Sequence, residues 1–392
     1  MRWPILSSLA LAGSLICSAL SPVLAQTLIV GNDNKNGVDQ NFKPVIREPG
    51  HDTLSVIDLS NPAAPRITAT VPLMNSVVGP PVNLAIVPSG DIALVANSLK
   101  PVVQGWGHRL EPDDKVFVVD LKASPPKIIG TVTVGKQPSG LAIDAKGDLA
   151  LVTNRADGTV SVLSIHGREV LVTQTVTVGT PADQVSAVAI TPDGTRALVT
   201  KPAANEVALL TINGGKLTYT KRDLPTGIFP YNVAVTPDGK LALTADNGNH
   251  GSSDGNVDTV GVIDLAANPP RVINHVVVGD SPEGLAVSPK GNLAVSVQAE
   301  GSNTAPSVSY HHAGGSVAIL AIDGTNVTKV GSVTVGAVPE AVAFSPDGSH
   351  IYVGNFFDGD LSILAVDGTK VTDTGQRLKL GGHPASMRAG PQ

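Results

Sequence analysis

A short pattern recurs along almost the whole chain, and it constrains the fold more than any other feature. One copy contains residues 132–135 (VTVG), 141–143 (LAI) and 149–154 (LALVTN), with turns between them. Its opening element returns at residues 176–179, 276–279 and 333–336. Such a fixed period indicates a repeat architecture in which each copy is one supersecondary unit. A repeat scaffold is generic, so specificity is expected where the copies differ.

Each copy predicts four short antiparallel strands. In the third copy these are residues 139–144, 149–154, 159–165 and 170–178. The runs are rich in Val, Ile and Thr and are separated by Pro-Asp-Gly, Asp-Gly or Asn-Pro turns, which is typical of tightly joined strands. No stretch after residue 25 shows a sustained helical period with caps. The sequence therefore predicts an all-β fold.

The two ends of the chain complement each other. Six first-strand segments are present, at residues 83–87, 139–144, 186–191, 231–236, 283–288 and 340–345. The chain opens instead with a second strand (28–32) and a third strand (53–59), and the missing first strand follows residues 378–384 at the C-terminus. This predicts seven four-stranded blades closed into a propeller, which leaves only short, protected edges. The alternative, a linear solenoid, would need polar end caps.

The first 25 residues resemble an export signal. Arg2 supplies a positive charge, residues 5–20 are mostly apolar, and Val23-Leu24-Ala25 offers a small-residue cleavage site. We therefore expect a signal peptide at residues 1–25, one propeller domain at 26–392, and a periplasmic or secreted protein without a membrane span. Cys17 is the only cysteine, so the mature chain would have no thiol chemistry. The net charge of −6 and the absence of basic runs disfavour nucleic-acid binding.

The ends of the second strands carry a recognisable tetrapeptide. Residues 151–154 read LVTN, residues 352–355 read YVGN and residues 94–97 read LVAN. In these segments the chain resembles the YVTN-repeat β-propellers, and the likeness extends over nearly all of it after residue 25. The resemblance implies the propeller fold. It leaves the activity open, because such propellers include lactonase-like enzymes, heavy subunits of periplasmic amine dehydrogenases, and binding proteins.

Four copies carry an insertion between their second and third strands, at residues 33–52, 98–114, 248–258 and 301–314. In a propeller these insertions should rise from one rim, where binding sites are common. Blade seven has a short turn and should form a notch in this lip. The insertions contain most of the candidate binding residues, namely His51, Trp106, His108, Arg109, His250, Tyr310, His311 and His312. The alternative is that polar loops collect histidines by composition alone.

The inner strands should begin at the mouth of a central channel on the same side. The residue that starts each of them reads, around the ring, Val82, Ser139, Ser186, Tyr231, Glu283, Glu340 and Ala385. Glu283 and Glu340 belong to adjacent blades, and His383 precedes the next inner strand. Such a carboxylate pair could share a proton, hold a cation or act as a general base. The alternative is that both are solvated rim charges.

Metal binding has weaker support. The insertions at 33–52 and 248–258 are rich in Asp and Asn, whose oxygens Ca²⁺ accepts, and Tyr310-His311-His312 could bind a transition metal. Neither region has a recognised ligand spacing. There is no Gly-x-Ser-x-Gly nucleophile motif.

Three functions remain open. The favoured one is a binding module whose long-loop face takes a protein, a glycan or a small molecule. The second is a metal-assisted, lactonase-like hydrolase in which Glu283 or Glu340 activates water and His383 or His311 is the acid partner. The third is a propeller subunit of a periplasmic oxidoreductase, which would need a cofactor-bearing partner.

Overall fold

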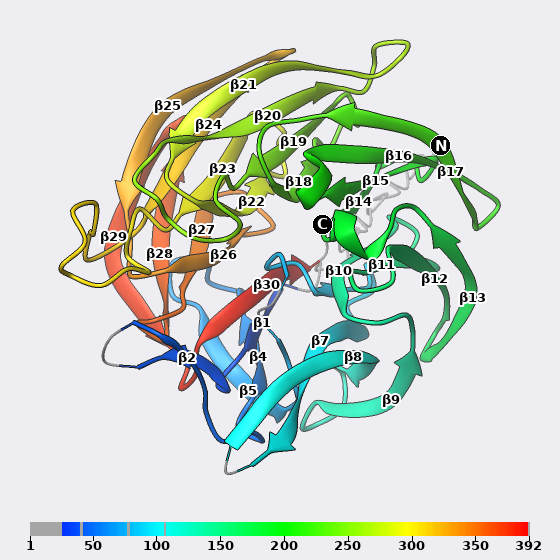
Figure 1. Cartoon of the computed structure of the whole chain (residues 1–392), viewed down its shortest axis with the longest axis horizontal. Coiled ribbons are helices and arrows are strands. Elements are labelled where there is room, and N and C mark those ends of the chain that lie inside the picture. Colours follow the sequence, from blue (N-terminus) through cyan, green and yellow to red (C-terminus); the bar gives the residue numbers. More distant parts are fainter. Residues whose placement is uncertain (1–25, 40–41, 77–78, 106, 391–392) are drawn as a thin grey trace, which may run out of the picture.

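The computed structural model describes residues 26–39, 42–76, 79–105 and 107–390, which form a ring of seven four-stranded sheets around a central axis (Figure 1). This confirms the predicted all-β, seven-bladed propeller. The predicted signal segment, residues 1–25, and Trp106 lie outside the described residues, and the domain boundary after residue 25 stays a prediction. The described part of the chain forms no helix long and apolar enough to cross a membrane.

The blades are numbered in chain order, and each is given from its inner to its outer strand. Blade one contains β30 (Pro384–Gly390), β1 (Thr27–Asn32), β4 (Thr53–Asp58) and β5 (Arg66–Pro72); blade two contains β6 (Leu84–Ile86), β7 (Ile92–Gln104), β8 (Gly107–Asp120) and β9 (Lys127–Thr133). Blade three contains β10 (Pro138–Ile143), β11 (Leu149–Asn154), β12 (Thr159–His166) and β13 (Glu169–Thr177); blade four contains β14 (Val188–Ile190), β15 (Arg196–Lys201), β16 (Glu206–Asn213) and β17 (Lys216–Pro225). Blade five contains β18 (Pro230–Val235), β19 (Leu241–Asp246), β20 (Asp258–Asp264) and β21 (Arg271–Gly279); blade six contains β22 (Pro282–Val287), β23 (Leu293–Gln298), β24 (Ser316–Asp323) and β25 (Asn326–Thr334). Blade seven contains β26 (Pro339–Phe344), β27 (His350–Asn355), β28 (Asp360–Asp367) and β29 (Lys370–Lys379). A hairpin of β2 (Asn36–Val38) and β3 (Pro44–Ile46) and two 3-10 turns, η1 (Pro181–Asp183) and η2 (Pro202–Ala204), complete the described elements.

The C-terminal strand closes the ring, as the sequence predicts. β30 pairs with β1 in antiparallel register from Thr27↔Gly390 to Asn32↔Pro384. β1 also pairs with β4, so it is an internal strand of blade one. Without β30, the backbone groups on one side of β1 would be left unpaired.

The asparagine that ends the repeated tetrapeptide joins the second strand of a blade to its third. The Asn154 amide donates to the hydroxyls of Thr159 and Ser161, both at 2.9 Å. Asn32 makes the same two contacts to Thr53 and Ser55 in blade one. These amides are fully buried, so each hydrogen bond forms where water cannot compete. The repeat is therefore visible in the sequence because the blade requires this contact.

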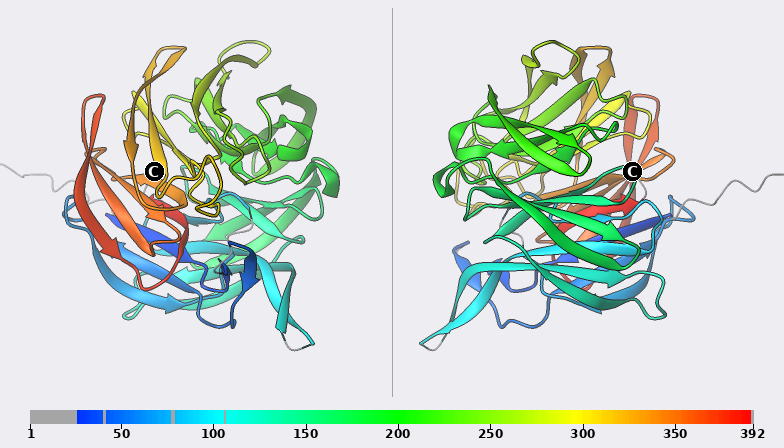
Figure 2. Two further views of the ribbon diagram at one scale, coloured as in Figure 1. Left: turned by 60° about the vertical axis from the view of Figure 1, so that its left-hand side comes forward. Right: turned by 90° about the vertical axis from the view of Figure 1, so that its right-hand side faces the viewer.

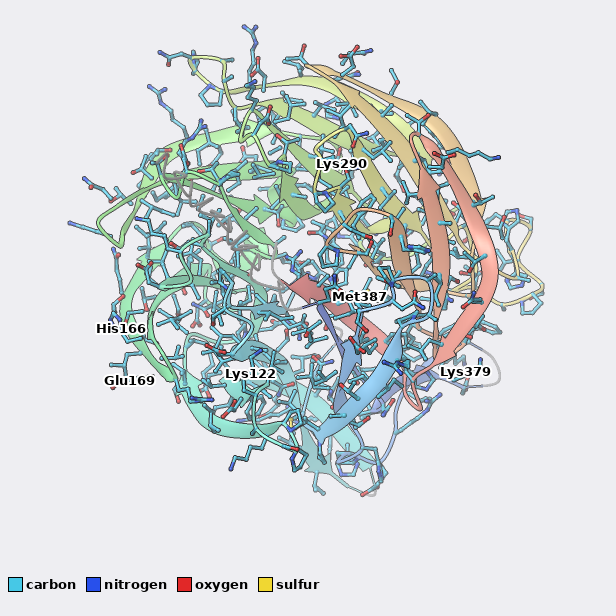
Figure 3. The ribbon with its side chains drawn as sticks, turned by 180° about the vertical axis from the view of Figure 1, so that it is seen from behind. Lys122, His166, Glu169, Lys290, Lys379 and Met387 are labelled. Carbon is cyan, nitrogen blue, oxygen red and sulfur yellow. The ribbon has the colours of Figure 1, made fainter. Side chains whose placement is uncertain are left out.

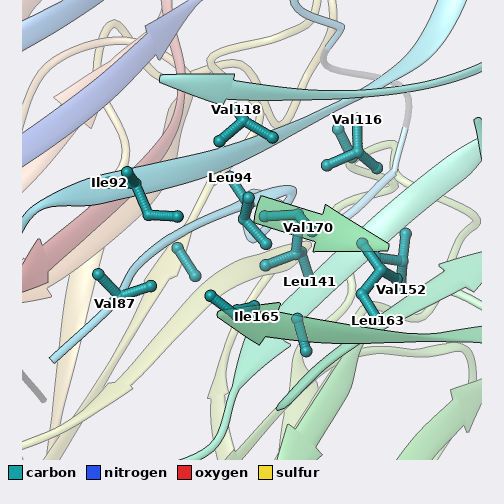
Figure 4. Packing of buried hydrophobic residues seen from close by; sticks show 13 residues of the cluster. Val87, Ile92, Leu94, Val116, Val118, Leu141, Val152, Leu163, Ile165 and Val170 are labelled. Carbon is teal, nitrogen blue, oxygen red and sulfur yellow. The ribbon is translucent and has the colours of Figure 1, made fainter. Parts of the chain in front are cut away.

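The hydrophobic core lies between neighbouring blades. One cluster joins blades two and three and includes Ile92, Leu94, Leu141, Val152 and Leu163 (Figure 4). All five side chains are fully buried. Each contributes about 2 kcal/mol by burial. Because similar clusters fill the other gaps between blades, each blade depends on both of its neighbours.

The blade-two insertion was predicted to be a loop, and this prediction is wrong. Residues 98–114 continue β7 and β8 as a regular antiparallel hairpin, paired as far as Gln104↔Gly107. This hairpin forms an arm that projects from the body of the ring (Figure 2). His108 and Arg109 therefore lie on the outer part of the arm and not on a lip around the channel.

Blade seven was predicted to leave a notch in the lip of long loops, but the blade-one insertion reaches across this position. Phe42, which precedes β3, lies 6.4 Å from the Phe357 ring of blade seven and 6.4 Å from the His311 ring of blade six, measured between ring centroids. The blade-one insertion therefore extends across the short turn of blade seven and contacts the loop of blade six.

The connection from blade one to blade two runs across the channel axis. The carbonyl of Val82 accepts a hydrogen bond from the Leu141 amide of blade three at 2.9 Å. The Val82 side chain packs in a cluster with Ala187 of blade four and Val233 of blade five. Residues 79–82 therefore lie between the two ends of the channel, and β6 begins only after this crossing.

Ring closure predicts a large effect of a short deletion. A chain that ends at Gly382 lacks β30, so blade one keeps three strands and the core against blade seven is opened. We expect loss of cooperative thermal unfolding, measured by circular dichroism. A chain that ends at Gly390 keeps β30 and serves as the control. Equal melting temperatures for the two chains would contradict closure by β30.

Candidate functional site

Two carboxylates lie side by side at the channel mouth. Glu283 is the second residue of β22 and Glu340 the second residue of β26, so both start inner strands of adjacent blades. Both are only partly exposed. The Asn247 amide approaches Glu283 Oε1 at 3.4 Å. The sequence prediction that these residues meet at the mouth agrees with their placement, whereas their catalytic role stays a prediction.

Desolvation dominates the electrostatics of this pair. Burial raises the pKa of Glu283 to about 8, partly offset by the hydrogen bond from Asn247. The pKa of Glu340 is raised well above its usual value by burial, and then by the negative charges of Glu283 and Asp33. Two neighbouring carboxylates with raised pKa values share protons. The pair therefore carries at least one proton at neutral pH.

An arginine and a tyrosine face the pair. Burial raises the pKa of Tyr231, and the charges of Glu283, Arg155 and Glu340 all act on it, so Tyr231 lies among these three groups. The Arg155 guanidinium donates to the Ser186 hydroxyl at 2.6 Å and to the side-chain carbonyl of Gln184. Two of its five N–H groups are used in this way, and no other residue in the described ranges accepts a hydrogen bond from it.

A glycine lets the two carboxylates come together. A Cβ added at Gly284, the residue after Glu283, would collide with the carbonyl oxygen of Glu340. Gly140 has the same relation to the Ser186 carbonyl, between blades three and four. Glycine is required at both positions because the inner strands approach each other there at backbone distance.

His383 occupies the same rim but is held by other groups. Its Nδ1 lies 2.7 Å from the Phe356 carbonyl, and its Nε2 lies 2.8 Å from the Arg47 guanidinium. Since a carbonyl and a guanidinium bind the two nitrogens, Nδ1 carries the proton and Nε2 accepts. This arrangement suits a residue that positions the loop and Arg47. Its predicted acid–base role is untested.

A buried ion cluster anchors the blade-one hairpin beside the mouth. The Lys35 ammonium is 2.6 Å from Asp52 and 3.1 Å from Asp33, and it also donates to the Asn75 carbonyl. Lys35 is 1% exposed and Asp33 is fully buried. Removing one member would leave a buried charge unpaired, which is strongly destabilising. The acidic residues of this insertion therefore surround an internal cation, the Lys35 ammonium.

The remaining predicted binding residues are spread around the long-loop face. His51 and His250 are exposed, and the His250 ring lies 4.5 Å from that of Phe229. Nδ1 of His311 contacts the Thr304 carbonyl at 3.0 Å, and Nδ1 of His312 contacts the Glu300 carbonyl at 2.8 Å. Both contacts lie within the blade-six loop.

Tyr310 also belongs to the blade-six loop. Its ring packs so closely on Gly255 of blade five that a Cβ there would clash. The structure therefore brings the loops of blades five and six together, and it separates His108 and Arg109 from them. The predicted binding roles of all these residues remain predictions.

The predicted metal ligands mostly serve the fold. Asp246 accepts from the Thr244 and Thr259 hydroxyls, and Asp258 accepts from the Ser281 amide. Within the described ranges, no group of three or more His, Cys, Asp or Glu side chains is arranged to hold a metal ion.

Sequence reasoning missed two important residues. Arg155 belongs to a short turn that was not expected to carry function. The one sign that this position varies between blades was that blade seven has Phe356 at the equivalent place. Lys35 carried only a weak signal, because it lies two residues after Asp33 in an insertion that also contains Lys43 and Arg47.

Comparison with known proteins supports the lactonase-like resemblance. Residues 114–252 match the family model for lactonase, 7-bladed beta-propeller. No curated protein sequence matches the chain. A candidate 6-phosphogluconolactonase from Bacteroides fragilis has a similar fold, with a TM-score of 0.68, 15% identity, and coverage of 93% of this chain and 98% of that one.

Two further solved structures show the same fold. A periplasmic gluconolactonase from Pseudomonas aeruginosa gives a TM-score of 0.62 at 18% identity, covering 93% of this chain and 98% of that one. Hydrazine synthase from Kuenenia stuttgartiensis gives 0.61 at 20% identity, covering 81% and 94%. The chain therefore has the fold of the lactonase-like propellers, and its chemistry has to be argued from its own residues.

The raised pKa of Glu283 predicts a pH-dependent stability. The folded state holds a proton on Glu283 up to about pH 8, whereas the ordinary pKa of a solvated Glu is 4.5. Between these values unfolding releases a proton, so stability falls as pH rises, by at most about 1.4 kcal/mol per pH unit. Glu283→Gln should remove this contribution and leave that of Glu340, so stability should fall less steeply than in the wild type, measured by urea unfolding from pH 5 to pH 8.5.

Glu169→Gln is the matched control, because Glu169 is the exposed first residue of β13 on the opposite face (Figure 3). It should follow the wild-type curve. A Glu283→Gln variant that loses stability in parallel with the wild type would show that Glu283 is already ionised at pH 5.

Proposed function

We propose that the channel mouth is the active site of an exported hydrolase that opens a lactone ring. The observation that carries this proposal is the desolvated Glu283–Glu340 pair, which near pH 8 holds a proton and a negative charge within one small site. The lactonase-like family match and fold support the hydrolase hypothesis better than the binding-module hypothesis.

The pair supplies both halves of an acid–base mechanism. Glu283, whose anion is favoured by the Asn247 amide, takes a proton from water as the water oxygen attacks the lactone carbonyl carbon. The carbonyl π electrons move onto oxygen. When the tetrahedral intermediate collapses, the ring C–O bond breaks and the proton of Glu340 passes to the leaving oxygen. The product is a hydroxy acid, and the proton gained by Glu283 then passes to Glu340, which restores the starting state of the pair.

Arg155 and Tyr231 would bind the substrate. The free N–H groups of Arg155 suit the carbonyl oxygen, which becomes negative during the attack. The Tyr231 hydroxyl keeps its proton at neutral pH because its pKa is raised, so it can donate to a sugar hydroxyl. The similar proteins named above lead us to an aldonolactone as the substrate class.

The metal-assisted form of this mechanism remains open as a variant of the proposal. A divalent cation at the mouth would find Glu283 and Glu340 as its ligands and would polarise the lactone carbonyl. Its binding would compete with the shared proton, so activity would depend on added metal and be lost after chelation.

Activity on D-glucono-1,5-lactone tests the proposal. We expect Glu283→Gln and Glu340→Gln each to lower kcat about 100-fold, because each removes one proton-transfer group. Hydrolysis is followed by acid release with the spontaneous rate subtracted. Wild-type activity should rise with pH towards about 8, where Glu283 ionises, and fall when Glu340 also loses its proton.

His108→Ala is the control, because His108 lies on the projecting arm and should leave kcat unchanged. Folding of each variant is checked by its circular dichroism spectrum. A wild-type protein that hydrolyses no lactone would refute the proposal and return attention to the binding module. Export is tested separately by fractionating cells that express the full chain.

A further inference from the structure

The seven inner strands share one register, which makes their residues comparable position by position. In each blade, the third residue after the channel-mouth position pairs with the third residue of the second strand, as in Ala142↔Leu151 and Arg388↔Ile29. Six blades carry alanine at this position, namely Ala85, Ala142, Ala189, Ala234, Ala286 and Ala343. The seventh, in β30, carries Arg388.

Arg388 and five of the alanines line a cavity of about 420 Å³ around the channel axis. The other wall residues are mainly apolar, for example Leu141, Val188 and Leu285. The lining includes none of the mouth residues, because residues 79–82 cross the channel between the two sites. The cavity is lined at one end by Pro192, Pro237 and Pro289, which lie in the turns between the first and second strands of their blades. Lys290, which Figure 3 labels, belongs to one of these turns.

The guanidinium of Arg388 has no ionic partner within the described part of the chain. No hydrogen bond or ion pair joins it to those residues, and burial alone lowers its pKa to about 10. It is therefore still a cation at neutral pH. Asp144 also lines the cavity, but its Oδ1 already accepts from the backbone amides of Gly147, Asp148 and Leu149.

Arg388 is a partly buried cation without an ionic partner among the described residues, at a position where the scaffold otherwise uses alanine, so it is suited to pair with an anion. A guanidinium binds a carboxylate through two parallel hydrogen bonds, and the apolar wall favours a ligand with an apolar body. We propose that this cavity binds a small organic carboxylate, with the carboxylate on Arg388 and the apolar part against the alanine ring. The site is separate from the channel mouth and does not depend on the lactonase proposal.

Titration calorimetry of the purified full chain with octanoate and with benzoate tests this proposal. We expect at least one of them to bind and to raise the melting temperature, since a ligand of the folded state stabilises it. Arg388→Ala should weaken binding about tenfold or more, because a charged hydrogen-bond pair is lost. Without ligand, Arg388→Ala should melt above the wild type, because alanine occurs in the six equivalent strands and the desolvated charge is removed.

The controls test whether binding needs Arg388 itself, the negative charge of the ligand and the apolar part of the ligand. Arg222→Ala removes an exposed arginine of β17 and should leave binding unchanged. Uncharged 1-octanol and inorganic phosphate should each bind more weakly than the preferred carboxylate. Equal binding by the wild type and Arg388→Ala, equal binding of octanol or of phosphate, or no binding of either carboxylate at up to about 10 mM would each overturn the proposal.

Discussion

The pairing of β30 with β1 is the interaction on which the rest of the structure depends. It places residues from the two ends of the chain in one sheet, so that blade one meets blade seven. The channel exists only after this closure. Glu340, His383 and Asp33 share a rim for the same reason, and Arg388 reaches the axis because it belongs to the closing strand. Because the core lies between blades, closure also completes the burial of the ring.

The repeat explains which positions could acquire function. Buried asparagines and Val-rich strands recur because every blade needs them, and a change there would weaken the contact between strands or between blades. The channel-mouth position near the start of each inner strand is not held to one residue type by the repeat, so it can vary. It is Val, Ser, Tyr, Glu or Ala, and the polar members belong to the five consecutive blades three to seven. The candidate functional residues therefore lie at positions where the repeat does not require one residue type.

The sequence alone predicted the number of blades, the closing strand and the position of Glu283 and Glu340, because all three follow from a regular register. It failed where a segment leaves the repeat. Residues 98–114 were expected to form a loop, but they continue β7 and β8 into an arm. The crossing of the channel by residues 79–82 depends on contacts with blades three, four and five, which lie far away in sequence. Arg155 and Lys35 could not be ranked, because their importance comes from burial and partners.

Both ends of the channel carry charged groups that are removed from water, and the two sites respond to this desolvation in different ways. At the mouth, two carboxylates are desolvated together, and the pair responds by keeping a proton. At the other end, an arginine is desolvated alone, and with so high an intrinsic pKa it keeps its charge. A scaffold selected only for stability would place small apolar residues at both levels, as it does with six alanines around Arg388. The charges are therefore best understood as features retained for ligands, with the carboxylate pair suited to proton transfer and the arginine suited to holding an anion.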